Sequence, residues 1–351
     1  MSATTTSRVR KQILARERLT PRRLVVTLLA LLVILLLFAM IALAVGSERV
    51  GLDVILKIIV SRFTNRPGDI PAEQIAIIAD IRLPRVLMAI VVGAAFSVAG
   101  AAFQALLRNP LADPGILGIS SGSALGAIAA TIFTESIPVS RPLAAFVSAV
   151  ITMGIVYVIG QGRRGTSTDR LILAGVIVNA FFSSLVIYMV TAASGSRLRS
   201  VFSWLIGDLG GEPGLLPVVA ALVAFGIFII FINSRSLNLL MTGEQESLAL
   251  GVEVKRVQVA VYVAASLLTG AAVAVGGAIG FVGLIIPHAV RLAGGSDNRL
   301  VVPGSALGGA AFLLFADTLA RTVIAPRELH IGVITALVGA PAFVYLLRRT
   351  S

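Results

Sequence analysis

The chain has 351 residues, of which 57% are hydrophobic and only 13% are charged. Soluble globular domains carry about 25% charged residues, so this composition excludes a soluble domain and indicates a polytopic membrane protein. The 34 glycines suit helices that pack closely in lipid, and the long apolar runs without alternation do not fit a transmembrane barrel. Because there is no cysteine, disulfides and thiolate metal sites are excluded. We expect the net charge of +12 to come from basic cytoplasmic ends, and not from a nucleic-acid surface.

Ten apolar segments approach the length that a helix needs to cross a bilayer, about 20 residues. An even number of crossings places both ends of the chain on one side, and the Lys and Arg residues of the loops favour the cytoplasmic side. The sequence therefore predicts an all-α membrane protein of ten transmembrane helices, with cytoplasmic N- and C-termini. The predicted spans are residues 24–45, 86–107, 116–133, 142–160, 171–193, 215–233, 257–277, 279–295, 303–321 and 332–347.

A basic tail, residues 1–23, precedes the ten-helix membrane domain of residues 24–349. A cleaved signal peptide has a shorter apolar core and small residues at its cleavage site, whereas the run at 24–45 is as long as a full span. We expect this run to be retained. The tail is expected to lie on anionic membrane lipid and to fix the topology.

A weak internal repeat relates two apolar stretches. Residues 93–110, GAAFSVAGAAFQALLRNP, align with residues 270–287, GAAVAVGGAIGFVGLIIP. Many transporters contain inverted repeats with the functional site at their interface, so we expect an inverted internal repeat here. Because most of the identical residues are Gly or Ala, close helix packing explains the same match without a repeat.

A polar reversal follows the second span, where residues 108–118 read RNPLADPGILG. Pro110 and Pro114 stop a helix, because proline lacks a backbone donor and restricts the residue before it. From the residues alone, a simple turn at the cytoplasmic face and a working element of the transporter both fit this segment.

Just before the second span, residues 81–85 read IRLPR. With the N-terminus inside, Arg82 and Arg85 lie at the outer face, which is usually poor in positive charge. These arginines either anchor the helix among lipid headgroups or receive carboxylates of an external protein in bidentate pairs.

The connection between the sixth and seventh spans, residues 234–258, is longer than the roughly two to eight residues that usually link helices in bundles. It carries three glutamates, then Lys255 and Arg256, around the short apolar run SLALGV. Such an amphipathic segment suits a docking surface for another protein. A helix that rests on the membrane is the alternative.

Ionisable residues are nearly absent within the spans. Asp317 and Arg321 lie four residues apart at the outer end of the ninth span, so we expect them to pair across one helical turn. Gln104 and Asn179 are lone polar residues in the second and fifth spans, and either helix–helix hydrogen bonding or lining of a transport pathway explains them. The two histidines lack the spacing of metal ligands, so no metal site is predicted.

The sequence contains no phosphate-binding loop, no nucleophile elbow and no metalloprotease helix. A transporter that hydrolyses ATP itself needs such a loop, and a proton-coupled carrier normally has an acid or a histidine deep in a span. We therefore predict a transport subunit that is not an enzyme and that another polypeptide energises. A secondary transporter driven by an ion gradient and an assembly protein without transport are the alternatives.

Several ordered segments together resemble one family, the FecCD-type permease subunits of iron-siderophore and cobalamin (type II) ABC importers. The resemblance covers residues 24–349 and excludes the basic tail. The segments are IRLPRVLMAIVVGAAFSVAGAAFQALLRNPLADPGILGISSGSALGA (81–127), SWLIGDL (203–209), GEQESLALGV (243–252), GAIGFVGLIIPHAVRLAGGSDNRLVVPGSAL (277–307), ADTLAR (316–321) and ELHIGVITALVGAPAFVYLL (328–347).

The resemblance implies a permease of ten spans in the cytoplasmic membrane that moves an iron-siderophore-type chelate by alternating access. Haem and cobalamin are the alternative substrates. The implied partners are a second permease copy or a close paralogue, two cytoplasmic ATPase subunits and an extracytoplasmic substrate-binding protein. ATP and Mg are used by the ATPase, and no cofactor is implied for this chain itself.

The resemblance also implies roles for individual residues. Arg82, Arg85 and Arg321 are expected to receive acidic residues of the binding protein. A cytoplasmic gate is expected at Asn109, Pro110 and Leu111, with Thr168 opposing them. The residues expected to seat in the ATPase are Gly243, Glu244, Glu246, Leu248, Leu250 and Gly251.

Overall fold

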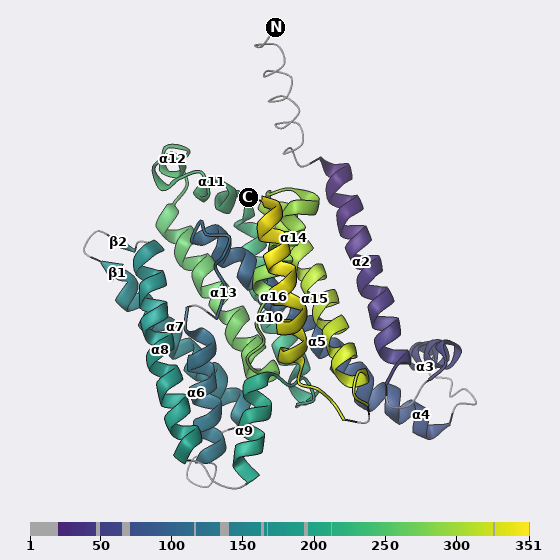
Figure 1. Cartoon of the computed structure of the whole chain (residues 1–351). Coiled ribbons are helices and arrows are strands. Elements are labelled where there is room, and N and C mark those ends of the chain that lie inside the picture. The colour runs from purple at the N-terminus through teal and green to yellow at the C-terminus, as the bar shows by residue number, and fades with distance from the viewer. Residues whose placement is uncertain are drawn as a thin grey trace.

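The chain folds into helices that are joined by short loops, with one short antiparallel hairpin (Figure 1). The computed structural model describes residues 20–46, 50–64, 71–115, 117–133, 140–162, 165–166, 168–192, 196–211, 213–325 and 327–350. Its elements are α2 (Pro21–Ala44), α3 (Leu52–Thr64), α4 (Ala72–Ala76), the π-helical η1 (Ile77–Arg82), α5 (Leu83–Leu106), α6 (Ile119–Ile132), α7 (Arg141–Gly160), β1 (Gln161–Gly162), β2 (Gly165–Thr166), α8 (Thr168–Ala192), α9 (Ser196–Ile206), the 3-10 turn η2 (Pro213–Leu215), α10 (Leu216–Ile232), α11 (Ser234–Leu240), α12 (Glu244–Ala249), α13 (Val254–Gly276), α14 (Val282–Gly294), α15 (Asn298–Thr322) and α16 (Ile331–Thr350).

Each of the ten predicted spans coincides with a helix. Within the described residues, seven helices are long and apolar enough to cross a membrane, and α6, α14 and α16 are shorter apolar helices. The prediction of an all-α, multi-pass membrane protein is therefore confirmed, while the count of ten crossings stays a prediction. Most of the predicted basic tail, residues 1–19, lies outside the described residues.

Several helix boundaries differ from the predicted ones by three residues or more, and two of these differences have identifiable physical reasons. The third span begins at Ile119 and not at residue 116, because Gly118 has a φ of 76°, in the left-handed region that a right-handed helix excludes. The ninth span begins at Asn298 and not at residue 303, because the Asp297 carboxylate caps the helix by accepting from the Arg299 amide.

The centre of the bundle is α5, which packs against α13, α14 and α15. In its most apolar stretch 78% of the residues are buried, compared with 6% for α2, which lies at the edge. Glycines allow the close approach: a Cβ at Gly93 would overlap the carbonyl oxygen of Gly309 on α15, and one at Gly100 would overlap that of Gly283 on α14. These backbone contacts fix the two helices around α5.

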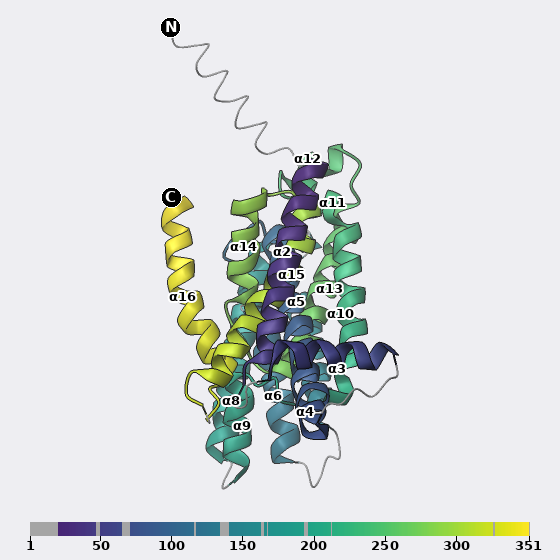
Figure 2. The ribbon, with the colours of Figure 1, turned by 90° about the vertical axis from the view of Figure 1, so that its right-hand side faces the viewer.

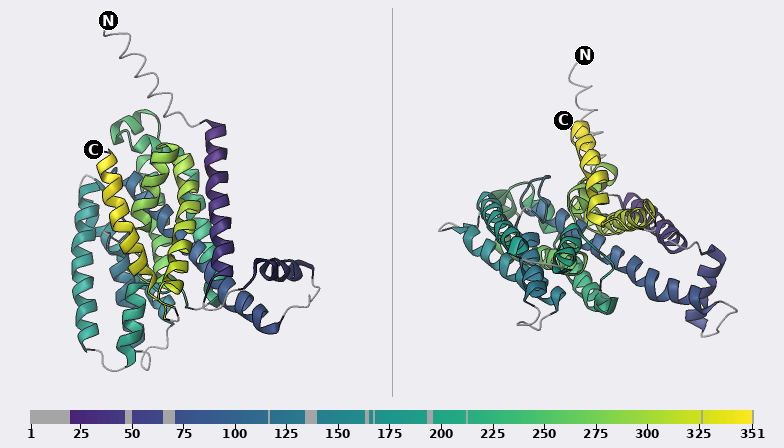
Figure 3. Two further views of the ribbon diagram at one scale, coloured as in Figure 1. Left: turned by 45° about the vertical axis from the view of Figure 1, so that its right-hand side comes forward. Right: turned by 60° about the horizontal axis from the view of Figure 1, so that its bottom comes forward.

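The outer helices present apolar side chains away from the bundle. α8 exposes Phe181 and Tyr188, and α16 exposes Leu337 and Tyr345. In a soluble protein such patches are rare, but in a membrane they face lipid tails or another transmembrane helix. α16 stands at the edge of the bundle, in contact with α14, α15 and α9 (Figures 2 and 3).

The two ends of the bundle differ. One end, which we call the α12 end, carries α11, α12, the β1–β2 hairpin, the start of α2 and the end of α16 (Figure 1). The other end, the α4 end, carries α4, α9 and α3, and α3 runs across the direction of the long helices (Figures 2 and 3). α2 begins and α16 ends at the same end of the bundle (Figure 1), while the number of crossings and the cytoplasmic placement of both chain ends stay predictions.

Candidate docking and gating sites

At the α12 end, the predicted docking segment folds into two short helices, α11 and α12. Gly243 and Gly251 bracket α12 with φ values of 144° and 81°, conformations that only glycine adopts without strain. The hydroxyl of Ser247 is buried and donates to the carbonyl oxygen of Leu239 at 2.8 Å, which folds α12 back onto α11. The turn is therefore built around residues that the sequence pattern had assigned to docking.

The outward face of this turn is apolar and acidic. Leu248 is 57% exposed and Leu250 is 65% exposed, while Glu244 and Glu246 lie in the first turn of α12. The side chains of Leu248 and Val254, with the charged residues beside them, line an open groove at the start of α13. Exposed leucines next to acids at the end of a membrane bundle suit contact with another protein.

A hydrogen-bonded cluster that sequence reasoning missed fixes α11 to the start of α15. The Asn238 side chain donates to the Asp297 carboxylate at 2.8 Å, and its amide oxygen accepts from the backbone and side-chain nitrogens of Asn298, each at 2.8 Å. Burial raises the pKa of Asp297, but hydrogen bonds from Arg299 and Asn238 outweigh it and hold the pKa below its usual value. The carboxylate stays charged, so the attachment of α11 is firm.

The predicted gate residues Asn109, Pro110 and Leu111 lie in the loop between α5 and α6, which we call the 107–118 loop and of which residue 116 lies outside the described residues. Side chains of the loop itself hold its shape. Asn109 accepts from the Leu111 amide at 2.9 Å, and Asp113 accepts from the Gly115 amide at 2.8 Å. Such turns mimic a backbone turn and stiffen the chain. Burial raises the pKa of Asp113, although the Gly115 hydrogen bond partly offsets it. Leu111 is 45% exposed at the tip of the loop.

The loop is wedged between two helices. On one side, a Cβ at Gly118 would lie 3.2 Å from the backbone of Asn179 on α8; on the other, a Cβ at Gly283 of α14 would lie 3.0 Å from Pro114. Asn179 is half-buried at this contact. Thr168, the expected opposing residue, begins α8, and its side chain lies outside the described part of the structure.

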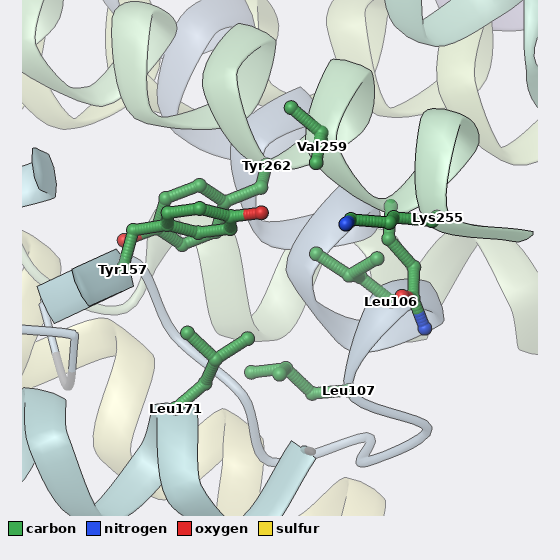
Figure 4. A pocket seen from close by; sticks show the side chains of 8 residues that line it. Leu106, Leu107, Tyr157, Leu171, Lys255, Val259 and Tyr262 are labelled. Atoms are coloured by element: carbon green, nitrogen blue, oxygen red, sulfur yellow. The ribbon is translucent and has the colours of Figure 1, made fainter. Parts of the chain in front are cut away.

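A small cavity lies beside the root of this loop (Figure 4). Leu106, Leu107 and Leu171 close one side, and Tyr157 and Tyr262 stack with ring centroids 5.5 Å apart on the other. Its volume of about 20 Å³ holds one water molecule at most, so it is not a chelate site.

Gln104 is buried between α5 and α14. Its side-chain nitrogen donates to the carbonyl oxygens of Gly283 at 3.2 Å and Leu284 at 3.3 Å, and its oxygen accepts from Arg291. Of the two explanations that the sequence left open for Gln104, this placement favours helix–helix hydrogen bonding. The sequence did not indicate a role for Arg291, because its partner Gln104 is 187 residues away.

Four charged residues form an ion cluster at the α4 end. Asp317 is fully buried and binds Arg321 and Arg85, each at 3.0 Å, and Arg85 also binds Glu328 at 2.8 Å. The expected pairing of Asp317 with Arg321 is confirmed. The Asp317 carboxylate pairs with both guanidiniums away from water, and the half-exposed Glu328 supplies the second negative charge that balances them.

The predicted docking arginines differ in their surroundings. Arg82 is 5% exposed and donates to the Leu43 carbonyl oxygen at 2.6 Å; Arg321 is 7% exposed and donates to the Ala42 carbonyl oxygen at 3.3 Å. Both therefore hold the end of α2 and are poorly presented to an external partner. Arg85 is more accessible and lines a hollow of about 220 Å³ with Asp80 and Met88.

The chain is similar to known transport proteins over nearly its whole length. A family model described as the FecCD transport family matches residues 32–349. The hemin transport system permease protein HmuU of Yersinia pestis is 39% identical over 339 residues, which cover 95% of this chain and 97% of that protein. The cobalamin import system permease protein BtuC of Halobacterium salinarum is 42% identical over 284 residues, covering 80% and 75%.

A solved structure has the same fold. It is that of an inward-facing ABC transporter of metal-chelate type, and it superposes with a TM-score of 0.80 and 30% identity over 93% of this chain and 99% of that chain. The apolar helices and the similarity to permeases agree with a multi-pass protein of the cytoplasmic membrane. The chain therefore belongs to the FecCD transport family and is the permease component of an ABC importer.

Proposed function

We propose that this permease imports an iron-siderophore-type chelate by alternating access, with ATP and Mg used by two separate ATPase subunits. The observation that carries the ATP-driven mechanism is the α11–α12 turn, which protrudes at the α12 end and is fixed to α15 by Asn238. A metal chelate as substrate is supported by the similar structure of metal-chelate type. Haem and cobalamin are the alternative substrates, because two similar permeases are named for transport of hemin and of cobalamin.

The ATPase docks on the exposed face of α12 in this proposal. Leu248 and Leu250 enter an apolar depression of the ATPase, while Glu244 and Glu246 meet basic residues at its rim. Gly243 and Gly251 hold the turn in shape, because no other residue adopts their backbone angles without strain. The α12 end is then cytoplasmic, together with both chain ends.

The 107–118 loop acts as the cytoplasmic gate. Its support is the rigidity that Asn109 and Asp113 provide and its position between α8 and α14. A stiff loop that two helices hold moves as a unit when either helix shifts, and Leu111 at its tip then opens or closes the path. Pro110 prevents the loop from joining α5, and Thr168 opposes it from the start of α8.

The binding protein docks at the α4 end through Arg85. Glu328, the half-exposed partner of Arg85, is the group that an acidic residue of the binding protein replaces. Arg82 and Arg321 support this site from inside, since they are bonded to α2 and Asp317. A bidentate arginine–carboxylate pair fixes orientation as well as contact.

A second permease copy, or a close paralogue, completes the pathway. Its support is the apolar face of α8 and α16, where Phe181, Tyr188, Leu337 and Tyr345 are exposed. The path lies between the copies, with Asn179 of α8 near its cytoplasmic end. Recognition of the chelate is left to the binding protein.

Affinity purification of the full chain from its own host in mild detergent, followed by mass spectrometry, tests this proposal. We expect an ATPase with a phosphate-binding loop and an extracytoplasmic binding protein to be recovered with it. Recovery of the chain alone, with uptake after reconstitution that needs an ion gradient and no ATP, would contradict the proposal and favour a secondary transporter.

A further inference from the structure

α14 contains a proline that leaves one carbonyl group without its usual partner. In an α-helix the carbonyl oxygen of residue 283 accepts from the amide of residue 287, but that residue is proline and has no amide hydrogen. Gly283 and Pro287 are both buried, so water does not replace the missing donor. An unpaired buried carbonyl of this kind is costly and calls for another donor.

Gln104 of α5 supplies the donor. Its amide nitrogen lies 3.2 Å from the Gly283 carbonyl oxygen and 3.3 Å from that of Leu284, and the side chain is 3% exposed. The close contact between Gly100 and Gly283 brings the two backbones near enough for this reach. The carbonyl group that Pro287 leaves unpaired in the α14 helix is therefore satisfied from the neighbouring helix; we call this missing backbone hydrogen bond the proline break.

Arg291 binds the oxygen of the same Gln104 side-chain amide. One guanidinium nitrogen donates to the Gln104 oxygen, and another lies 3.4 Å from the carbonyl oxygen of Ala101. Within the described residues, Arg291 has no carboxylate at ion-pair distance. Arg291 lies one turn beyond Pro287 on α14, and its hydrogen bonds join that part of α14 to α5.

The contacts of Gln104 and Arg291 link the 107–118 loop, through α5, with the α11–α12 turn, through α14 and α15. On α5, the Asn109 amide donates to the backbone carbonyl oxygen of Gln104 at 3.1 Å, so Gln104 lies at the root of the 107–118 loop. On α14, the helix ends at Gly294, which packs against Leu300 of α15. α15 begins at the Asn238 cluster that holds α11.

We infer that Gln104 and Arg291 form a clamp across the proline break of α14 and transmit displacement of the α11–α12 turn to the 107–118 loop. They are positioning residues for transport, since neither has to touch the chelate. A helix bends most readily at a proline, so the half of α14 beyond Pro287 can follow α15 while its first half stays on α5. The inference rests on the proposed ATP-driven function, because it assumes that displacement begins at α12.

A double-mutant cycle with Pro287→Ala tests whether the clamp exists. Alanine restores the amide that Gly283 lacks, so the Gln104 side chain is no longer needed there. We expect Gln104→Leu to lower the melting temperature of the purified full chain strongly when Pro287 is present. The same change is expected to lower it much less in the Pro287→Ala background. Ser97→Ala, which alters a fully buried hydroxyl on the same helix, serves as the matched control and is expected to change little.

Equal losses in the two backgrounds would overturn the clamp. If Gln104→Leu does not yield folded protein, Gln104→Asn is compared in the same two backgrounds, because its shorter side chain cannot reach both Gly283 and Arg291. This cycle needs no ATPase and therefore decides the clamp independently of the proposed function.

Transmission is tested in proteoliposomes that contain the complete complex, by the amount of substrate taken up per ATP hydrolysed. Gln104→Leu and Arg291→Met are expected to lower this ratio about tenfold, the effect of losing one strong hydrogen bond. The double variant Gln104→Leu with Pro287→Ala is expected to have a higher ratio than Gln104→Leu alone. A ratio unchanged from that of the unmodified chain would overturn transmission, whereas an unmodified complex without ATP-dependent uptake would contradict the proposed function itself.

Discussion

Asp317 is the residue on which the ion cluster of the α4 end depends. Its carboxylate is fully buried and is the shared partner of Arg85 and Arg321. Removal of one member of a buried ion pair leaves an uncompensated charge, which is more costly than replacement of the whole pair. The cluster also bonds to the end of α2 through Arg321, so its loss loosens the docking surface and the helix together.

Asp317→Asn is therefore expected to destabilise the permease by about 3–5 kcal/mol. The measurement is the thermal melting of the purified chain in detergent. Asp208→Asn is the matched control, because Asp208 is exposed and its side-chain oxygen still accepts from the Gly210 amide after the change. Equal melting temperatures for Asp317→Asn and Asp208→Asn would contradict the role of the buried carboxylate.

Asp113 gives the gate loop a dependence on pH. Burial raises its pKa above the ordinary value of 3.8, so the charged carboxylate is less favourable in the folded loop than in the unfolded chain. The cost of the charged form is absent below that value, grows as the pH rises through the interval between the unfolded and folded pKa, and is complete above it. Asp113→Asn keeps the acceptor for the Gly115 amide and is expected to raise the melting temperature at pH 7.5 more than near pH 4. A gain that does not change with pH would argue against this assignment.

At the scale of elements, the bundle is held by backbone contacts between α5 and its neighbours. The carbonyl oxygen of Gly283 occupies the space that a Cβ at Gly100 would need. Gly100→Ala must therefore push α5 and α14 apart, at a cost of about 1–3 kcal/mol. Gly154→Ala in α7 is the control, since that position has open space and a helix gains up to about 1 kcal/mol from alanine. Thermal melting of the two variants should differ in sign, and a Gly100→Ala variant as stable as the unmodified chain would contradict the packing.

The element that our proposal assigns most directly to contact with the ATPase is α12. Leu248→Asp places a charge on the exposed apolar face that we assign to the ATPase. We expect the variant to lose the ATPase on purification, or to retain it without uptake coupled to hydrolysis. Leu52→Asp is the control, because Leu52 is about equally exposed but begins α3 near the α4 end. Normal uptake by the Leu248→Asp variant would move the ATPase interface elsewhere.

The helices of the ten predicted spans could be predicted, because a long apolar run without alternation in lipid must satisfy its backbone hydrogen bonds within the segment. The sequence missed α3, α9 and α11, which are too short or too amphipathic to resemble spans. It also missed Arg291 with Gln104 and Arg85 with Glu328, because pairs separated by 187 and 243 residues leave no local pattern. The burial of Arg82 and Arg321 was likewise invisible, since it depends on how α2 meets the ion cluster.

At the scale of the whole molecule, the family resemblance stated from the sequence is confirmed by the family model and by the similar solved structure. Permeases named for hemin and for cobalamin are both similar to this chain in sequence, so the family alone does not select the substrate. Gln104 and Arg291, the polar pair between α5 and α14, bind one another and the backbone. Substrate choice is then expected to lie with the binding protein.

The most direct test of the account is ATP-dependent uptake by the chain reconstituted with its copurified ATPase and binding protein. A ferric siderophore, haem and cobalamin are supplied in turn to proteoliposomes, with and without ATP and with and without an ion gradient. We predict uptake of the ferric siderophore that requires ATP and the binding protein and that is unaffected by collapse of the gradient. Uptake of haem or cobalamin alone would correct the substrate, whereas uptake that follows the gradient and ignores ATP would contradict the importer mechanism.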